Sequence, residues 1–574
     1  MILALADSRR LTGPSLLLDG PGAVVEVRLP DEQAEAVVAA WERHLRRLLE
    51  VLGWEAEAIR HRRYTGGASL AFAAPADALY AATEVNEAAW AAAAAEFTGD
   101  DVPPFEAEAE RLREMIRQEE DPTFRILAAA ADDHGVTLLR DDHHVSAGLG
   151  TGALTWPVEK LPAPEAVRWE AAHDVPVALV TGTNGKSTTV RMLGAILRAA
   201  GRTPGLTTTD HVVVGEEVLD RGDYSGPGGA RAVLRDGRVQ AGVLEVARGG
   251  LLRRGLGVPR ATAAAVTNVA ADHLGEYGIE TVEQLAEAKF VVAKALGAGG
   301  VLVTNAEDAY CAHEGHRHEA LLEARGARVC WTALDPDHER LRVHRAKGGL
   351  ACAVVDGHLV YSDGGDWTSV AAVDAVPCTY GGLARYNVRN ALTALGLARA
   401  LGVPDDAIRR GLEGFASDPA SNPGRANVFD IGEARALVDF AHNAHGLDAL
   451  AETVARLPAR RRLVLLSSAG DRSEADLAAL ARAAAQLDAA RYVLAELPDH
   501  LRGRAPGEVP ALLRLALVSE GAPEDAIEDA PDPVEGTRRA LDWATAGDLL
   551  VLLVLSHRDE ALALVRTAAA AARR

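Results

Sequence analysis

One short stretch has the residue types and spacing that phosphate binding requires. The apolar run Val177–Val180 leads into Thr-Gly-Thr-Asn-Gly-Lys-Ser, and a helical pattern follows. A buried strand, a glycine-rich turn and a helix N-terminus together align backbone N–H groups against a phosphate. Lys186 can reach the outer phosphates, and Ser187 can offer its hydroxyl to Mg2+. The usual spacing of such loops places Gly where this chain has Val180, but a purely structural turn would not need Gly-Lys-Ser at the start of a helix.

Three further polar residues follow predicted strands of the same region. Glu245 ends the apolar run Ala241–Val246, and a carboxylate there could hold Mg2+. Asn268 follows the next run and could bond a base or a phosphate, and His273 could ligate a second cation through a neutral nitrogen. Strand-end acids are often only solvated, and a lone histidine is more often structural. The carboxyl ends of parallel strands meet at one edge, however, so we expect these residues to share a site with Lys186.

Four residues farther along the chain are open to two interpretations each. Lys289 lies in the helical pattern Val282–Leu296, where a solvent-facing lysine is the default. Asn390 could read a purine edge or merely help cap a helix. Arg425 could meet a phosphate from across an interdomain joint, and Asp439, at a strand end, could hold a ribose hydroxyl; for both, a surface charge is the alternative. ATP held from both sides would imply domain closure that expels water.

The elements that must position these residues predict a multi-domain α/β protein. Apolar runs alternate with helical patterns after residue 172, which is typical of a doubly wound parallel sheet. We expect an α+β N-terminal domain at 1–165, a central P-loop domain at 166–422 and a smaller Rossmann-like α/β domain at 423–574. In the first domain the patterns predict strands at Val24–Leu29 and Tyr64–Phe72, helices at Glu32–Leu52, Asp77–Phe97 and Phe105–Gln118, and a linker at Trp156–Pro164.

Composition narrows the class of protein further. A formal charge of -22 argues against a general nucleic-acid surface. The cysteines Cys311, Cys330, Cys352 and Cys378 show no CxxC spacing, which fits a reducing compartment. The first residues lack the pattern of a signal peptide, and the longest apolar run, Leu549–Leu555, is far short of the ~20 residues that span a bilayer. We therefore expect a cytoplasmic protein with no nucleic-acid or membrane partner, and a homo-oligomer that acts on small amino-acid or peptide substrates.

Taken together, the motifs resemble the Mur ligase family of ATP-dependent amide-forming ligases. The resemblance rests on their order: Gly-Thr-Asn-Gly-Lys-Ser, Glu245, Thr-Asn-x-x-x-Asp-His-Leu, Lys289, Asn-x-x-Asn, Pro-Gly-Arg425 and Asp-Phe-Ala-His-Asn. It implies ATP and Mg2+ as cofactors and an acyl phosphate intermediate. The expected catalytic residues are Lys186, Glu245, His273, Lys289 and Arg425, and the expected metal ligands are Ser187, Glu245 and His273. The expected nucleotide contacts are Thr183, Asn184, Gly185, Lys186, Ser187, Thr188, Asn268, Asn390, Arg425 and Asp439.

Within that family the chain looks like one branch, the Mur-like half of cyanophycin synthetases. The segments 222–236, 244–253 and 501–508 carry this likeness, and 69–87 resembles that family's N-terminal domain. The family's ATP-grasp domain has no counterpart here, because Leu149-Gly-Thr-Gly leads through a short linker to the phosphate loop. The resemblance implies joining a basic, arginine-like amino acid to a carboxylate of an aspartyl-type amino acid or peptide. It also implies a carbamylated Lys289, which would require that the lysine be buried beside His273.

Departures from the family pattern keep alternatives open. Tyr386 replaces a His, Ala444 a Pro and His211 a Gly. The first two concern the nucleotide and the third concerns the acyl substrate. A folylpolyglutamate or cell-wall type of ligase, or a non-catalytic ATP-binding partner subunit, are the alternatives. The candidates for holding the amino-acid acceptor are Asp471, Arg472, Arg502 and Arg504, each of which could equally be a surface charge.

Overall fold

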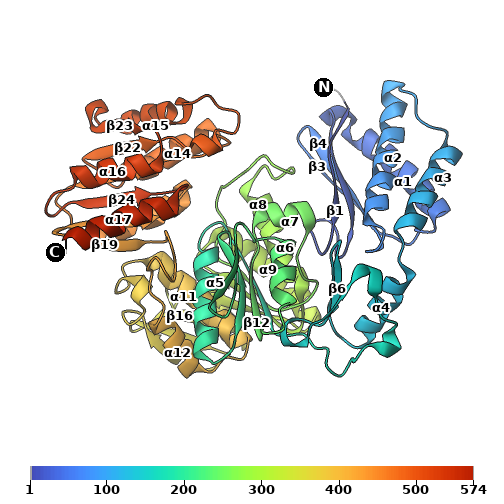
Figure 1. Ribbon diagram of the computed structural model, residues 1–574, viewed down its shortest axis with the longest axis horizontal. Coiled ribbons are helices and arrows are strands. Elements are labelled where there is room, and N and C mark those ends of the chain that lie inside the picture. The colour runs from blue at the N-terminus through green and yellow to red at the C-terminus, as the bar shows by residue number, and fades with distance from the viewer. Residues whose placement is uncertain (1–2, 573–574) are drawn as a thin grey trace. The chain divides into compact units, whose positions relative to one another are not determined.

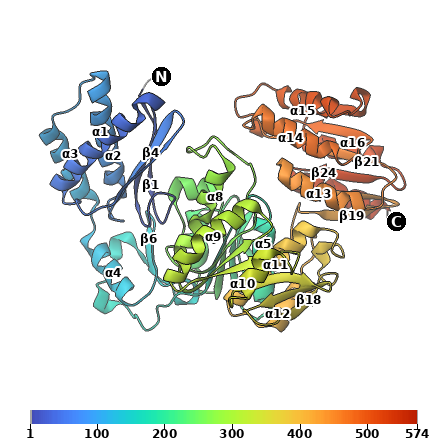
Figure 2. The ribbon, with the colours of Figure 1, turned by 180° about the vertical axis from the view of Figure 1, so that it is seen from behind.

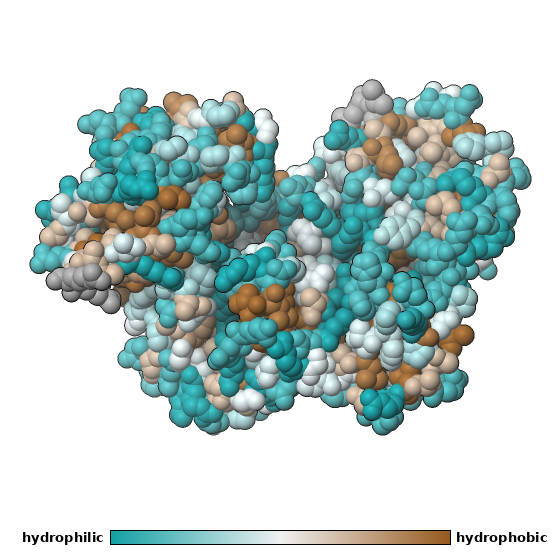
Figure 3. Space-filling model, viewed as in Figure 1, coloured by the Kyte–Doolittle hydropathy of each residue, from teal (hydrophilic) through white to brown (hydrophobic). Residues whose placement is uncertain are grey.

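The computed structural model describes residues 3–572, which form two compact units. The first consists of Met1–Cys352, Tyr361–Thr368 and Thr393–Ile408, and the second of Ala353–Val360, Ser369–Leu392 and Arg409–Arg574. The first unit therefore contains both the N-terminal region and most of the central region. Across the described residues, no helix combines the length and apolar character that crossing a bilayer requires. Hydrophilic residues cover most of the face seen in Figure 3, as the acidic composition leads one to expect.

An antiparallel sheet of four strands begins the first unit. Its strands are β1 (Ala4–Leu11), β2 (Gly22–Arg28), β3 (Ile59–Tyr64) and β4 (Gly67–Ala73), in the order β1-β2-β4-β3. Helices α1 (Ala34–Leu52) and α2 (Leu79–Thr98) bury an apolar core against it, and α3 (Phe105–Glu119) packs on them (Figure 1). The strand predicted at Tyr64–Phe72 is present from Gly67 onward as β4, but Tyr64 ends the separate strand β3, which was not predicted. The chain turns at Gly66, whose φ of 75° is left-handed, so β3 and β4 form a hairpin.

A smaller three-stranded sheet follows. Helix α4 (Pro122–Asp133) precedes the strands β5 (Leu138–Arg140), β6 (His144–Ala147) and β7 (Leu154–Pro157). The segment predicted as a linker therefore begins within β7, and short 3-10 turns follow at Val158–Lys160 and Pro164–Ala166.

The main sheet is the predicted doubly wound one. Its strand order is β11-β10-β9-β12-β8-β13-β14-β15-β16-β17-β18, and the boundary between the two units passes through β16, β17 and β18. Its strands are β8 (Val177–Thr181), β9 (Pro204–Thr207), β10 (His211–Val214), β11 (Glu217–Arg221), β12 (Ala241–Glu245), β13 (Ala261–Val266), β14 (Leu296–Asn305), β15 (Arg328–Thr332), β16 (Leu350–Val355), β17 (His358–Ser362) and β18 (Thr368–Ala372). Its helices are α5 (Lys186–Ala199), α6 (Pro227–Leu234), α7 (Arg248–Arg254), α8 (Val282–Phe290), α9 (Ala309–Ala324), α10 (Glu339–Arg345), α11 (Arg385–Ala400) and α12 (Asp405–Glu413).

Helices cover both faces of this sheet. On β9, the side chain of Leu206 contacts Gly194 of α5, whereas the adjacent Gly205 lies against Val233 of α6. Because successive strand residues point to opposite faces, α5 and α6 lie on opposite sides (Figures 1 and 2). Strand β8 lies between β12 and β13, with Val180 beside Glu245 and Thr181 beside Val266. This order brings the phosphate loop, Glu245 and the loop after β13 to one edge.

The second unit contains the smaller α/β domain. Its sheet has the order β19-β20-β24-β21-β22-β23. The strands are β19 (Asn427–Ile431), β20 (Ala434–Asp439), β21 (Arg462–Leu466), β22 (Arg491–Ala495), β23 (Ile527–Ala530) and β24 (Leu549–Leu553). Helices α13 (Ala444–Arg456), α14 (Glu474–Ala485) and α15 (Glu508–Ser519) form one apolar core with it, and α16 (Pro533–Trp543) and α17 (Arg558–Ala572) form the other (Figures 1 and 2).

Candidate active site

The phosphate loop joins β8 to α5 and is built from glycines that no other residue could replace without movement. Gly182 has a φ of 145°, and a Cβ there would lie 1.9 Å from Oγ1 of Thr267. Gly185 precedes α5 with a φ of 84°. Lys186, half-buried at the first turn of α5, donates from Nζ to the carbonyl of Thr183 at 2.9 Å. The loop predicted from the sequence is therefore present as a strand, a turn and a helix N-terminus.

Asn268 fastens this loop to the end of β13. Its Oδ1 accepts from the N–H of Asn184 at 2.9 Å, and its Nδ2 donates to the carbonyl of Asn184 at 3.0 Å. Thr267 donates to the same carbonyl at 2.7 Å, and the N–H of Thr183 donates to the carbonyl of Asn268 at 2.9 Å. The amide that we expected to contact a base or a phosphate thus bonds the loop backbone. A direct contact of Asn268 with nucleotide stays a prediction.

Ser187 and Glu245 meet beneath the loop. The hydroxyl of Ser187 donates to Oε2 of Glu245 at 2.7 Å, and both residues are buried, with Glu245 2% exposed. Thr209 lies 3.5 Å from the same hydroxyl. A buried carboxylate and a hydroxyl are hard oxygen donors of the kind that Mg2+ prefers, so these residues fit the metal that the sequence implied.

Lys289 is buried, contrary to the solvent-facing position that its helical pattern favoured. It is 4% exposed in α8, a helix that begins with a capping box between Thr281 and Gln284. Desolvation, aided by the charges of Lys186 and Arg248, lowers the pKa of Lys289 to about 7, against the opposing effect of Asp272. A buried lysine near neutrality is a reactive amine, which meets one condition for carbamylation.

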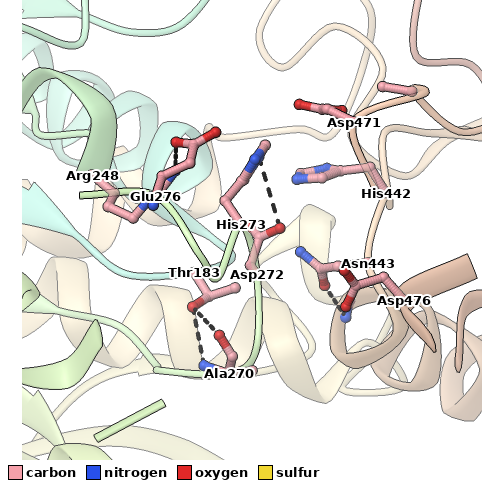
Figure 4. A network of polar contacts seen from close by, with 12 residues as sticks. Thr183, Arg248, Ala270, Asp272, His273, Glu276, His442, Asn443, Asp471 and Asp476 are labelled. Atoms are coloured by element: carbon pink, nitrogen blue, oxygen red, sulfur yellow. Dashed lines mark hydrogen bonds and ion pairs between the residues drawn. The ribbon is translucent and has the colours of Figure 1, made fainter. Parts of the chain in front are cut away.

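His273 lies on the loop between β13 and α8, with its side chain 34% exposed. Figure 4 shows it beside Asp272, and its Nε2 lies 3.8 Å from Oδ1 of Asp272. The backbone of His273 has a φ of 52°, which is uncommon for a residue with a side chain. The structure thus brings Lys186, Glu245, Lys289 and the His273 loop into one unit.

Arg248 is a residue to which sequence reasoning assigned no role. It begins α7, three residues after Glu245, and its side chain is 10% exposed. One arm pairs with Glu276 (Figure 4), while Nη1 is buried without a hydrogen-bond partner among the described residues. Its position in the stretch 244–253, already quoted for its likeness to one branch of the family, was the available signal.

In the second unit, Arg425 and Asp439 form one cluster. The guanidinium of Arg425 lies 4.2 Å from the ring centroid of Phe440. Asp439 accepts from the N–H groups of Ala426 and Ala441, both at 2.7 Å. Burial raises the pKa of Asp439, while Arg425 and these N–H groups oppose the rise. Asp439 therefore holds the turn that carries Arg425, and the contacts of both residues with ATP stay predictions.

The two asparagines of the Asn-x-x-Asn motif also form hydrogen bonds within the protein. Asn387 donates to the carbonyl of Cys378 at 2.8 Å, and Asn390 donates to Oδ1 of Asn387 at 3.2 Å. Tyr386, which stands in place of the family's histidine, has a buried hydroxyl without a partner among the described residues, and burial raises its pKa well above the usual value.

The acceptor candidates divide into two pairs. Arg504 donates to the carbonyls of Gly470 and Arg472, both at 3.0 Å, and contacts Glu508 at 2.5 Å. Its donors thus hold the loop after β21. Asp471 pairs with Arg502, and both side chains are partly exposed. A contact of any of these four residues with a ligand stays a prediction.

Comparison with known proteins agrees with this geometry. Residues 180–398 match the Mur ligase middle domain, and residues 424–553 match the Mur ligase glutamate ligase domain. The chain belongs to the Mur ligase family. The two matched regions contain the phosphate loop, Glu245, His273 and Lys289 in the first, and Arg425 and Asp439 in the second.

Individual relatives in this family differ in substrate. Cyanophycin synthetase of Trichormus variabilis is 37% identical over 385 residues, which is 67% of this chain and 42% of that protein. The chain thus spans well under half of that relative's length. The UDP-N-acetylmuramoyl-L-alanyl-D-glutamate--2,6-diaminopimelate ligase of Chlorobaculum tepidum is 28% identical, over 73% of this chain and 84% of its own. Among solved structures, E. coli FolC in complex with DHPP and ADP covers 70% of this chain and 89% of its own, with 22% identity and a TM-score of 0.49.

Proposed function

We propose that this Mur ligase joins an amino acid to a carboxylate at the expense of ATP, through an acyl phosphate. The observation that carries the proposal is the buried Ser187–Glu245 hydrogen bond directly beneath a Lys186-bearing phosphate loop. Kinases also place a hydroxyl and a carboxylate at such a loop. The buried Lys289 at the same edge, together with the family match, favours a ligase.

The bonds would change in two steps. A carboxylate oxygen of the first substrate attacks the γ-phosphorus of ATP, the bond to the β-phosphate oxygen breaks, and ADP leaves. The amine nitrogen of the second substrate then attacks the acyl carbon. The carbon–oxygen bond to phosphate breaks, inorganic phosphate leaves, and the nitrogen loses a proton. Lys186 would stabilise the negative charge that develops on the transferring phosphoryl group.

Mg2+ would be held by Ser187 and Glu245, and a second ion by His273. When bound, these ions neutralise charge on the phosphate oxygens. Burial, aided by the charges of Lys186 and Arg248, lowers the pKa of Lys289. Carbamylation of Lys289 would place an anion beside these two cations and would thereby replace repulsion with attraction. Arg425 and Asp439 are the residues proposed to contact the nucleotide from the second unit.

The acyl substrate that we propose is aspartyl-like, with a second carboxylate near the reacting one. Arg248 supports this choice. Its buried Nη1 has no hydrogen-bond partner in the described part of the chain, its Nη2 pairs with Glu276, and its positive charge contributes to lowering the pKa of Lys289. Burying one N–H group of a guanidinium costs free energy unless an acceptor bonds to it, and a carboxylate fits the geometry of the guanidinium. The amine is proposed to be basic and arginine-like, in keeping with the partly exposed Asp471 at the β21 loop.

A substrate panel with product mass spectrometry tests the proposal. Aspartyl peptides with a free or an amidated second carboxylate, and a folate-like acid, are each combined with arginine, lysine, ornithine and glutamate. We expect amide products only from dicarboxylate acyl substrates with a basic amine. Arg248→Lys should raise KM for the acyl substrate without changing that for ATP. If glutamate joined to a folate-like acid is the only product, the folylpolyglutamate alternative is correct. ATP binding without any product would indicate the non-catalytic partner.

A further inference from the structure

We infer that the N-terminal sheet positions the loop that carries His273, with Arg62 and Tyr64 of β3 as its positioning residues. The inference rests on the proposed function only where it predicts a metal effect. It assigns a role to the first 75 residues, whose sequence contains no recognisable chemistry of its own.

The His273 loop has a backbone that its own sequence does not favour. Between β13 and α8, His273 and Tyr277 have φ angles of 52° and 53°, in the left-handed region that residues with side chains seldom adopt. Such conformations persist only where surrounding contacts determine them. Within the described loop the backbone bonds are few. The N–H of Gly275 donates to the carbonyl of Ile279 at 2.7 Å, the N–H of Ile279 donates to the carbonyl of Glu276 at 3.1 Å, and Glu276 and Ile279 form an isolated antiparallel bridge.

The missing support comes from the hairpin β3–β4. Arg62 donates from Nη1 to the carbonyl of Gly278 at 2.8 Å. Thr65, in the hairpin turn, donates to Oε2 of Glu280 at 3.0 Å. The ring of Tyr64 lies so close to Gly278 that a Cβ there would be 2.1 Å from it, and Gly278 itself has a φ of 64°. Two loop positions, Gly278 and Glu280, are thus fixed by residues outside the loop.

Strand β1 completes the support from the other side. The guanidinium of Arg9 lies 4.6 Å from the ring centroid of Tyr277, and Arg253 of α7 donates to the Tyr277 hydroxyl at 2.9 Å. Arg9 also donates to the carbonyl of Leu252, and the N–H of Thr12 donates to the carbonyl of Arg254, at 3.3 and 2.8 Å. The same sheet therefore holds α7, whose first residue Arg248 contacts Glu276.

The chain supplies a matched control on the same strand. Arg62 and Arg63 are neighbours on β3, so their side chains point to opposite faces. Arg63 is 50% exposed and lies 3.8 Å from Glu35, away from the loop. Arg62→Ala and Arg63→Ala remove the same charge from the same strand, and only the first removes the loop contact.

The test measures the loop and the metal separately, in the full chain. The rate of amide hydrogen exchange in residues 270–281, measured without nucleotide, shows how firmly the N-terminal sheet holds the loop. Binding of Mn2+ with a non-hydrolysable ATP analogue, followed by electron paramagnetic resonance, reports its consequence. Arg62→Ala should speed exchange of the loop several-fold and weaken Mn2+ binding by roughly 10-fold, as loss of an outer contact to a metal site does. Arg62→Lys should recover part of both losses, and Arg63→Ala should match the wild type.

Each outcome decides something. If Arg62→Ala exchanges and binds Mn2+ as Arg63→Ala does, the inference is wrong. If wild-type protein binds no Mn2+ with the analogue, yet Arg62→Ala still speeds exchange, the support is real and the proposed metal site is wrong. Should Arg62→Ala fail to fold, Thr65→Val removes one loop contact without a change of charge, and the same two measurements apply.

Discussion

The hydroxyl of Ser187 donates a 2.7 Å hydrogen bond to the carboxylate of Glu245, joining the first turn of α5 to the end of β12. Glu245→Gln keeps the size of the side chain but removes the charge that would hold Mg2+. We expect turnover to fall by roughly 10²–10³-fold, the range seen when one preorganised electrostatic contact to a transition state is lost. Phosphate release under saturating ATP measures it.

Glu217→Gln is the control for this substitution, because Glu217 lies exposed on β11. It should leave turnover unchanged. Glu245→Gln turning over at the wild-type rate would show that this carboxylate holds no metal.

Asn268→Ala should weaken ATP binding without abolishing the fold. The substitution leaves the N–H and the carbonyl of Asn184 without their side-chain partner, at a cost of about 1–3 kcal/mol. We expect the dissociation constant for ATP, measured by calorimetry, to rise about 10-fold by the same reasoning. Asn268→Asp retains an acceptor, but its carboxylate would face the carbonyl of Asn184 and add negative charge beside the phosphate loop, so it should weaken ATP binding more than alanine does. Unchanged affinity in Asn268→Ala would mean that the loop does not bind nucleotide.

Lys289→Met should stabilise the protein, and more so at low pH. The pKa of Lys289 is lowered to about 7 from an ordinary value near 10.5. Between these two pH values Lys289 is protonated in the unfolded chain but mostly neutral in the folded one. The unfolded state therefore binds more protons, and the free energy of unfolding of the wild type increases as the pH rises from about 7 towards 10.5. Below pH 7, Lys289 is charged in the folded protein, so the full free-energy cost of burying that charge is present. Methionine removes this cost. Thermal melting at pH 6 and pH 9 should show the larger gain at pH 6. An equal gain at both values would indicate a lysine of ordinary pKa.

Arg504→Ala should affect the amine substrate alone. Its guanidinium holds the carbonyls of Gly470 and Arg472, beside the Asp471–Arg502 pair. Loosening this loop should raise KM for the amine several-fold and leave that for ATP within twofold. Arg482→Ala removes an exposed arginine of α14 and serves as the control. A change in KM for ATP of the same size in Arg504→Ala would refute an amine-specific role.

Local pattern was enough to predict the phosphate loop and the strand-end residues. An apolar run before Gly-Lys-Ser fixes the strand, the turn and the helix, and parallel strand order then places Glu245 and the His273 loop at the same edge. The doubly wound central sheet and the smaller α/β sheet follow from the same alternation.

Burial and hydrogen-bond partners could not be read from the pattern. Lys289 sits in a helix that reads as amphipathic, and only the packing of α8 against its neighbours buries it. Nothing in the sequence indicated that the side chains of Asn268 and Asp439 bond to the backbone of neighbouring segments, and their contacts with nucleotide stay predictions. The hairpin at Gly66 was missed because the glycine was taken as the start of a strand, not as a turn.

The transfer of one oxygen atom tests the acyl phosphate most directly. An acyl substrate from the panel is prepared with 18O in its reacting carboxylate and incubated with ATP and the amine. Because that oxygen attacks the γ-phosphorus and stays on phosphorus when the amide forms, each phosphate released should carry one 18O. Phosphate without 18O, accompanied by amide product, would contradict the account.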